Sequence, residues 1–295
     1  REAIRSQIAT PLGTGLDEAA WGIHQVANAA MARALRAVSS ERGRDPRRFA
    51  LAAFGGSGPV HAVTLARSLD ITEIIVPPAA GVFSALGLLV PETEHHHVRT
   101  LKQALAGADE ADLARAYGAL ETTGRDALEG EGFGPERMEF ERFADLCYRG
   151  ENASLTVPVA ADRAIGEAMA ESFAVEHERT FGYRSDDEVV ELVNLRVIAR
   201  GRSETPRVPE ALAITPRAQV EAGDGARRPV YFGPEVGRIE VPVVGRDWIG
   251  AAWREGPFIV EEYDSTTVVP PGCRARAVDW GALLIEVDAE RREGE

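Results

Sequence analysis

Several features are scarce in this 295-residue sequence, and each scarcity excludes a class of protein. The two cysteines, Cys147 and Cys273, are too few and too far apart for a disulfide-stapled secreted fold or a thiolate zinc site. No apolar run approaches the ~18 residues that cross a bilayer, and no basic-then-apolar leader opens the chain. The 33 basic residues against 47 acidic ones give a net charge of −14, which argues against a nucleic-acid surface. We expect a cytoplasmic protein without a membrane or nucleic-acid partner.

The first 90 residues alternate between helical and strand patterns, on a chain whose 44% apolar content is enough for a sizeable core. Asp17, followed by Glu18, is typical of a helix N-cap, and the apolar spacing after it predicts a long helix ending near Gly43. The expected elements are helix 1–9, helix 17–43, strand 49–54, helix 59–69, strand 73–76 and a short helix over 82–90. This order predicts an α/β fold with buried strands.

The pattern changes after Pro91 and again near residue 205. Residues 203–229 carry four prolines and indicate a linker, and the chain beyond them is short strands and turns. We therefore predict three regions: an α/β region over 1–95, an α+β region over 96–205 and a β-rich region over 206–295. The elements expected in the second are helix 109–130, strands 138–148 and 153–159, helix 162–181 and strand 188–200.

The most informative stretch is Gly55-Gly56-Ser57-Gly58, between a predicted strand and a predicted helix that starts at Pro59. Glycine permits unusual backbone angles and keeps no side chain between the backbone and a ligand. Proline suits the first position of a helix, so the helix presents its free N–H groups at this loop. The spacing matches neither the dinucleotide fingerprint nor a P-loop. The residues alone leave two alternatives: a contact for a nucleotide, or a tight turn that binds nothing.

Five segments together resemble the hydantoinase A / 5-oxoprolinase family, which includes ATP-using subunits of acetone and acetophenone carboxylases. They occur in family order and cover nearly the whole chain: residues 18–23 (EAAWGI), 49–90 (starting FALAAFGGSGPVHA), 145–152 (DLCYRGEN), 177–183 (HERTFGY) and 261–272 (EEYDSTTVVPPG). The resemblance implies an ATP-dependent subunit that activates a cyclic amide for ring-opening hydrolysis. The alternatives are a subunit of an ATP-dependent ketone carboxylase, or a non-catalytic scaffold for a partner subunit.

The resemblance also implies an actin-like ATPase core in which two α/β lobes clamp ATP with Mg²⁺ or another divalent metal. Its adenosine-side loop corresponds to Gly55–Gly58. The Asp-Gly-Gly-Thr phosphate loop of the other lobe does not occur in this sequence, so we expect the C-terminal part of such a subunit. The implied partners are the missing N-terminal lobe, a hydantoinase B-type second subunit and the cyclic amide. Alone, the chain is expected to have weak or no ATPase activity, because phosphoryl transfer depends on groups placed around the γ-phosphate.

The candidate nucleotide-binding residues are Gly55, Gly56, Ser57, Gly58 and His61. His61 can orient a phosphate or bind a metal, or simply hydrogen-bond to backbone. In the run His95-His96-His97, residues alternate between faces if the run is a strand, so only His95 and His97 could share a metal; a surface strand with incidental histidines is the alternative.

The candidate acid–base groups are Glu261, Glu262 and Asp264, in a bend that can form a substrate-site wall or merely cap a turn. For other polar and aromatic residues a structural role competes with a functional one. These are Asn28, Glu92, Glu94, Cys147, His177, Glu178, Tyr183, Trp248 and Trp253.

Overall fold

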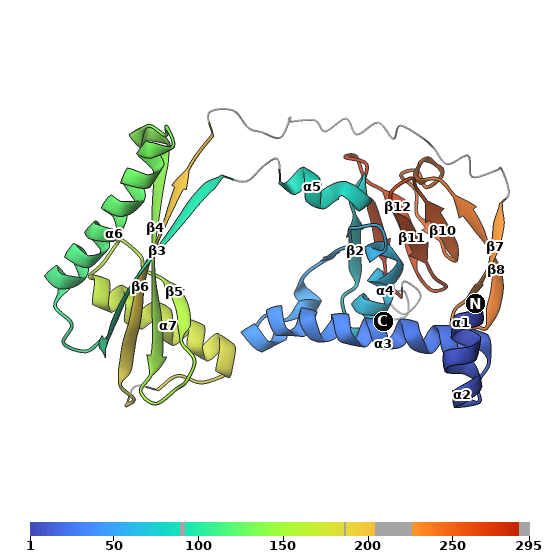
Figure 1. The fold of residues 1–295 in the computed structure, drawn as a ribbon, viewed down its shortest axis with the longest axis horizontal. Coiled ribbons are helices and arrows are strands. Elements are labelled where there is room, and N and C mark those ends of the chain that lie inside the picture. Colours follow the sequence, from blue (N-terminus) through green and yellow to red (C-terminus); the bar gives the residue numbers. More distant parts are fainter. Residues whose placement is uncertain (89–91, 186, 204–225, 289–295) are drawn as a thin grey trace. The chain divides into compact units, whose positions relative to one another are not determined.

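The computed structural model describes residues 1–88, 92–185, 187–203 and 226–288 as two compact units. Unit 1 comprises Arg1–Glu41, Asp45–Leu88 and Ala211–Glu295, and unit 2 comprises Arg42–Arg44 and Leu89–Glu210. The chain thus begins in unit 1, forms unit 2 and returns to unit 1 (Figure 1). None of the described helices is both long and apolar enough to span a bilayer.

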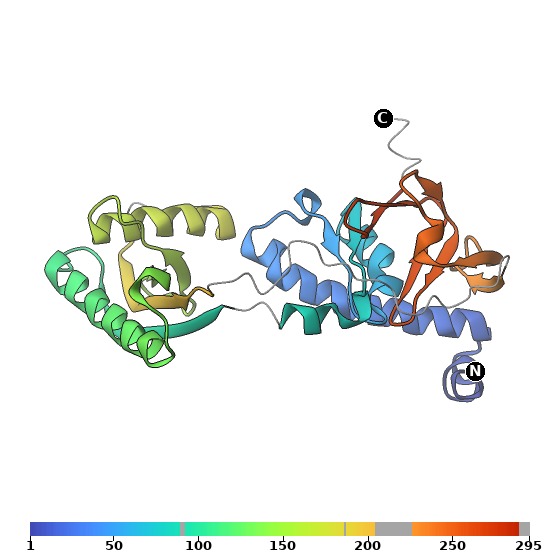
Figure 2. The same ribbon diagram turned by 90° about the horizontal axis from the view of Figure 1, so that it is seen from above.

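Unit 1 starts with short helices and the 23-residue helix α3, the long blue helix of Figures 1 and 2, which lies beside α4. The helical elements are α1 (Glu2–Ile4), a π-helical turn (Arg5–Ala9), α2 (Thr10–Leu12), α3 (Leu16–Val38), α4 (Gly58–Ser68) and α5 (Phe83–Gly87). The strands are β1 (Leu51–Ala52), β2 (Glu73–Val76), β7 (Arg227–Tyr231), β8 (Arg238–Val244), β9 (Arg254–Glu255), β10 (Phe258–Glu261), β11 (Thr266–Val269), β12 (Arg274–Ala277) and β13 (Leu283–Glu286).

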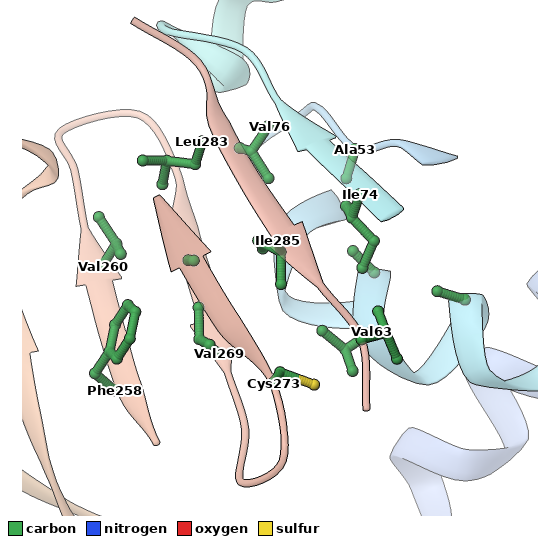
Figure 3. Packing of buried hydrophobic residues seen from close by; sticks show 14 of the residues in the cluster. Ala53, Val63, Ile74, Val76, Phe258, Val260, Val269, Cys273, Leu283 and Ile285 are labelled. Carbon is green, nitrogen blue, oxygen red and sulfur yellow. The ribbon is translucent and has the colours of Figure 1, made fainter. Parts of the chain in front are cut away.

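Two sheets organise unit 1. One has the order β1-β2-β13-β12-β9, in which only β1 and β2 are parallel; the other has the order β11-β10-β8-β7. Strand β13 pairs antiparallel with β2, with Ile285 opposite Ile74. The core between α4 and the sheets is mainly aliphatic, and Figure 3 shows Val63, Ile74 and Ile285 within it. Residues from both ends of the chain therefore build one core.

Unit 2 is an antiparallel sheet with the order β3-β6-β4-β5, covered on one face by α6 and α7. Tyr117 on α6 and Phe173 on α7 are fully buried against that face. Asp109 caps α6 by accepting from the N–H groups of Ala111 and Asp112. The elements are β3 (Thr93–Ala104), α6 (Glu110–Gly130), β4 (Met138–Tyr148), β5 (Leu155–Pro158), α7 (Ile165–Phe181) and β6 (Val190–Gly201).

Two sequence-based predictions about unit 1 are wrong. Asp17 does not cap the long helix: α3 begins at Leu16, the Glu18 carboxylate accepts from the N–H of Gly15 at 3.1 Å, and Asp17 forms an ion pair with Arg238. The strand expected over 49–54 shrinks to Leu51–Ala52, because a turn capped by Asp45 precedes it and the glycine loop follows.

The division at residues 95 and 205 stays a prediction at the level of domains. In the compact units, residues 226–288 belong with residues 1–88, because β13 pairs with β2. Most of the predicted linker over 203–229 lies outside the described residues, and β7 begins at Arg227 within its last part. The mixed helix-and-sheet character predicted for the chain is confirmed.

Candidate functional site

The glycine loop, residues 55–58, joins β1 to α4 and combines an unusual backbone with unused donors. Gly55 has a φ of 83°, in the left-handed region that favours glycine, and its N–H donates to the carbonyl of Ala80 at 2.7 Å. Among the described residues, the N–H groups of Gly56, Ser57 and Gly58 meet no acceptor. A Cβ added to Gly58 would meet nothing within 4 Å. The loop therefore has open space beside free backbone donors.

The other side of the loop is closed by a turn of its own chain, residues 262–265. The carbonyl of Gly56 accepts from the N–H of Thr266 at 3.3 Å, and a Cβ on Gly56 would lie 3.3 Å from the Asp264 carbonyl oxygen. The Asp264 carboxylate accepts from the N–H of Gly81 at 2.9 Å. A side chain on Gly81 would collide with Asp264. A ligand therefore has access from the side of Gly58 and not from the side of Gly56.

Each of the three candidate catalytic carboxylates has a partner. Glu261 pairs with Arg228 at 3.1 Å, and Glu262 makes a two-point contact with Arg246 at 2.7 and 2.8 Å. Arg246 is almost buried and also donates to three backbone carbonyls, those of Val76, Pro77 and Gly281. These contacts fasten the turn to the strand ends beneath it. They favour an architectural role for Glu262 and Asp264, and the acid–base role remains a prediction.

His61, in the first turn of α4, belongs to a polar cluster on the buried side of α3. Its Nδ1 lies 2.9 Å from Oδ1 of Asn28, which is 4% exposed. The Asn28 amide nitrogen lies 3.0 Å from Nδ1 of His24, and the two imidazoles stack with centroids 4.9 Å apart. Burial, and then the neighbouring His61, lower the pKa of His24. The sequence singled out His61 and Asn28 separately, but not His24.

Comparisons with known proteins assign the chain to a family. The family model of the hydantoinase/oxoprolinase domain matches residues 1–97, and that of the hydantoinase/oxoprolinase C-terminal domain matches residues 101–285. The chain belongs to the hydantoinase/oxoprolinase family. The predicted family resemblance is thereby confirmed.

Relatives within the hydantoinase/oxoprolinase family are longer than this chain. An uncharacterised protein of Methanocaldococcus jannaschii is 36% identical over 97% of the chain and 40% of its own length. The caprolactamase subunit alpha of Pseudomonas jessenii is 32% identical over 92% of the chain and 40% of its own length. The chain thus spans about two fifths of these relatives.

Two solved structures share the fold. The crystal structure of the ATP-dependent caprolactamase from Pseudomonas jessenii matches 97% of this chain and 42% of that chain, with a TM-score of 0.82 and 31% identity. The nucleotide-free structure of acetone carboxylase matches the same shares with a TM-score of 0.62 and 21% identity. The acetone carboxylase match shows the fold alone.

The histidine run of this hydantoinase/oxoprolinase chain lies on β3, in unit 2. His95 and His97 share one face, with ring centroids 6.2 Å apart, whereas His96 contacts Glu94 at 3.3 Å. Nε2 of His95 lies 2.8 Å from Glu131, and burial lowers the pKa of His97. Within the described ranges, no group of three or more His, Cys, Asp or Glu side chains is arranged to hold a metal. Metal binding at His61 or His95 remains a prediction.

Two family segments, 145–152 and 177–183, meet in unit 2 around His177, which is 0% exposed. The ring hydrogen-bonds to the Tyr183 carbonyl at 2.9 Å and to Glu151 at 3.3 Å. Its aromatic neighbours are Tyr148, Phe173, Phe181 and Tyr183. With both nitrogens used and no exposed surface, His177 has the contacts of a structural residue.

The remaining sequence candidates have local structural contacts. Burial raises the pKa of the Cys147 thiol, as expected for an inert buried cysteine. Trp248 lies under the guanidinium of Arg254, and Trp253 under those of Arg274 and Arg276. Glu92 is exposed. Among the described residues, none of these side chains contacts the glycine loop.

Proposed function

We propose that this chain is the C-terminal part of an ATP-dependent hydantoinase/oxoprolinase subunit that activates a cyclic amide for ring-opening hydrolysis. The observation that carries the proposal is the glycine loop, which leaves backbone N–H groups unused and has open space beside Gly58 at the start of α4. Helix N-termini and bare glycine backbone suit the oxygens of a nucleotide's phosphate or sugar. The similarity to an ATP-dependent caprolactamase supports this choice, because a lactam is a cyclic amide.

In this proposal the chain supplies the adenosine-side loop, Gly55–Gly58 with His61, of an actin-like ATP clamp. The phosphate loop would come from an N-terminal lobe outside the chain, which accords with the two fifths of the relatives' length that the chain spans. ATP with Mg²⁺ would lie between the lobes, and metal ligands would come from the phosphates and the other lobe. A hydantoinase B-type subunit would be the second partner, in keeping with relatives named as subunits. We place the subunit in the cytoplasm.

The chain's own contribution is to bind and orient. Free N–H groups at the loop can donate to the nucleotide, and the turn at residues 262–265 keeps the loop in one conformation. Phosphorylating an amide oxygen turns a poor electrophile into one that water can attack, but that step needs groups around the γ-phosphate. Alone, the chain should therefore bind nucleotide weakly and turn over little or none.

A ketone-carboxylase subunit is the second candidate, and acetone carboxylase shares the fold at 21% identity. The higher identity and TM-score of the caprolactamase favour the amide-hydrolysing assignment. A scaffold that binds only a partner subunit would show no nucleotide contact at the loop, and the following experiment detects that outcome.

Adding a single methyl group tests the loop. Gly58→Ala places a methyl in the open space without a positive φ or a clash, so folding should be unchanged or slightly favoured. In amide NMR spectra, ATP in the low millimolar range, about −4 kcal/mol of binding, should shift residues 55–58. Gly58→Ala should weaken that binding about tenfold, or ~1.4 kcal/mol. ATPase turnover is assayed in parallel.

The matched control is Gly118→Ala, another open helical glycine, on α6 of unit 2. It should leave the ATP response unchanged. An absence of shifts at residues 55–58 up to about 10 mM ATP would refute the nucleotide contact, because binding weaker than that is negligible. An equal loss of binding in both variants would also refute it.

A further inference from the structure

The cluster of His24, Asn28 and His61 has an arrangement that fixes where a proton can reside. His24 and Asn28 are one helical turn apart on α3, and His61 lies on the neighbouring α4. Trp21 also stacks with His24, with ring centroids 5.4 Å apart, so the His24 ring has both the indole and the His61 ring as stacked neighbours. Asn28 is within hydrogen-bond distance of both imidazoles.

The amide of Asn28 makes the two histidines unequal. Its oxygen can only accept, so Nδ1 of His61, at 2.9 Å, carries a hydrogen. Its nitrogen can only donate, so the His24 nitrogen that receives it carries a lone pair; Nδ1 is the nearer, at 3.0 Å, with Nε2 at 3.3 Å. Neutral His61 is then the Nδ1–H tautomer. Its Nε2 has a lone pair, is not fully buried and has no partner within the described part of the chain.

Adding a proton to each ring has different consequences. An imidazolium has two donors and no acceptor, so a charged His24 would lose its bond from the buried Asn28 amide. A charged His61 keeps its bond to Asn28 and gains an N–H at Nε2. Two charges on rings stacked 4.9 Å apart repel, so a proton added to one ring disfavours a proton on the other.

The surroundings of the pair add to this asymmetry. The indole of Trp21 attracts a cation at His24, but burial and the nearby His61 lower the pKa of His24. Tyr231 contacts Trp21 at its edge, and at the start of α3 Asp17 is paired with Arg238. The opposite charges of Asp17 and Arg238 offset each other, so this pair does not shift the added proton from His61 to His24.

We propose that Asn28 is a positioning residue that assigns the single proton of the His24–His61 pair to Nε2 of His61 and keeps His24 neutral. His61 then presents a charged N–H donor three residues after Gly58. Under the proposed function, on which this part rests, the N–H at Nε2 of His61 donates to an anionic oxygen of a nucleotide at the glycine loop. The proton assignment itself requires no ligand.

Ring-nitrogen NMR on the unliganded chain tests the assignment directly, since the sequence has only six histidines. Between pH 5 and 8, His61 should be the Nδ1–H tautomer when neutral and should take up its proton at a higher pH than His24. His96, which is exposed, provides an internal reference in the same spectra. A protonated Nε2 in neutral His61, or earlier protonation of His24, would overturn the proposal.

Asn28→Asp distinguishes positioning from mere packing. The carboxylate has nearly the same shape but can accept from both rings, so His24 can be charged while hydrogen-bonded. The titration midpoint of His24 should rise by about one pH unit or more, because an opposite charge now lies within contact distance. An unmoved midpoint in a folded variant would show that the amide only fills space. His61→Gln shows which resonances belong to His61.

ATP binding as a function of pH tests the ligand part separately. Affinity should fall as pH rises through the His61 midpoint, and His61→Gln should remove that dependence. If the ring-nitrogen results hold but ATP does not bind, the proton assignment is supported and the proposed function fails. If ATP binds with no change across the midpoint, the proposed role of His61 as a charged donor is refuted.

Discussion

His61 and His177 are both in segments typical of the family, yet the structure treats them in opposite ways. His177 in unit 2 is 0% exposed and uses both ring nitrogens, on Tyr183 and Glu151. His61 in unit 1 uses Nδ1 on Asn28 and leaves Nε2 without a partner among the described residues. The difference shows how to separate architecture from chemistry within one family. His177 is fully satisfied by its own fold, whereas His61 keeps one ring nitrogen without a partner among the described residues, as the proposed function requires.

Unit 1 contains a similar contrast. Contacts hold the turn at residues 262–265 in place, whereas the backbone at Gly58 is open. Arg246→Met would leave Glu262 nearly buried and unpaired, and we expect a loss of about 3 kcal/mol in the free energy of unfolding. All four tryptophans are in unit 1, so their fluorescence during urea unfolding reports on this unit. Adding Glu262→Gln should restore part of the loss. A loss below about 1 kcal/mol would show that the turn is fastened by other contacts.

His177→Leu is the next largest expected effect and tests the closed histidine. It leaves the Tyr183 carbonyl and the Glu151 carboxylate without their partner inside an aromatic cluster, which should cost about 2–4 kcal/mol. Hydrogen exchange of backbone amides should show faster opening of unit 2, with the tryptophan signal of unit 1 unchanged.

His61→Leu is the matched variant for the open histidine, and it should cost less than His177→Leu, about 1–2 kcal/mol, because it leaves only one buried acceptor, the Asn28 oxygen, without its partner. Equal destabilisation by the two leucine variants would abolish the distinction between a closed and an open ring.

The smallest expected effect is on the pH dependence of stability. The pKa of His24 is lowered in the folded chain, so around its ordinary value near 6.5 the unfolded chain binds the extra proton. The contribution of His24 to stability is therefore complete above that pH and is lost as the pH falls through the lowered folded-state pKa. Urea titrations between pH 5 and 8 should show a slope that His24→Gln reduces and His96→Gln does not. An identical slope in both variants would place the titrating group elsewhere.

Short-range signals predicted much of this molecule. Glycine and proline punctuation located the loop at residues 55–58 and the start of α4, apolar spacing located α3, and an alanine- and acid-rich composition located α6. The prediction that Asp17 caps α3 was wrong because Gly15, two residues earlier, occupies the cap position, and its N–H donates to the carboxylate of Glu18. Capping is decided by which side chain reaches the free N–H groups, and two acidic residues in sequence make that ambiguous.

Long-range partnerships were harder to predict. The spacing of His24 and Asn28 was visible, but their contact with His61 depends on how α3 and α4 pack. The partner of Glu262 is Arg246, sixteen residues earlier, and no local pattern connects them. The assignment of residues 226–288 to the same unit as residues 1–88 follows from the β2–β13 pairing, which the sequence does not indicate.

That pairing also has a consequence during synthesis. All strands of unit 2 lie between Thr93 and Gly201, so its sheet can close while the rest of the chain is still being made. The larger sheet of unit 1 must wait until Leu283–Glu286 leaves the ribosome, and until then β2 has an unpaired edge. A chain that stalls before those four residues would therefore have a finished second unit and an unfinished first one, the one that holds the glycine loop.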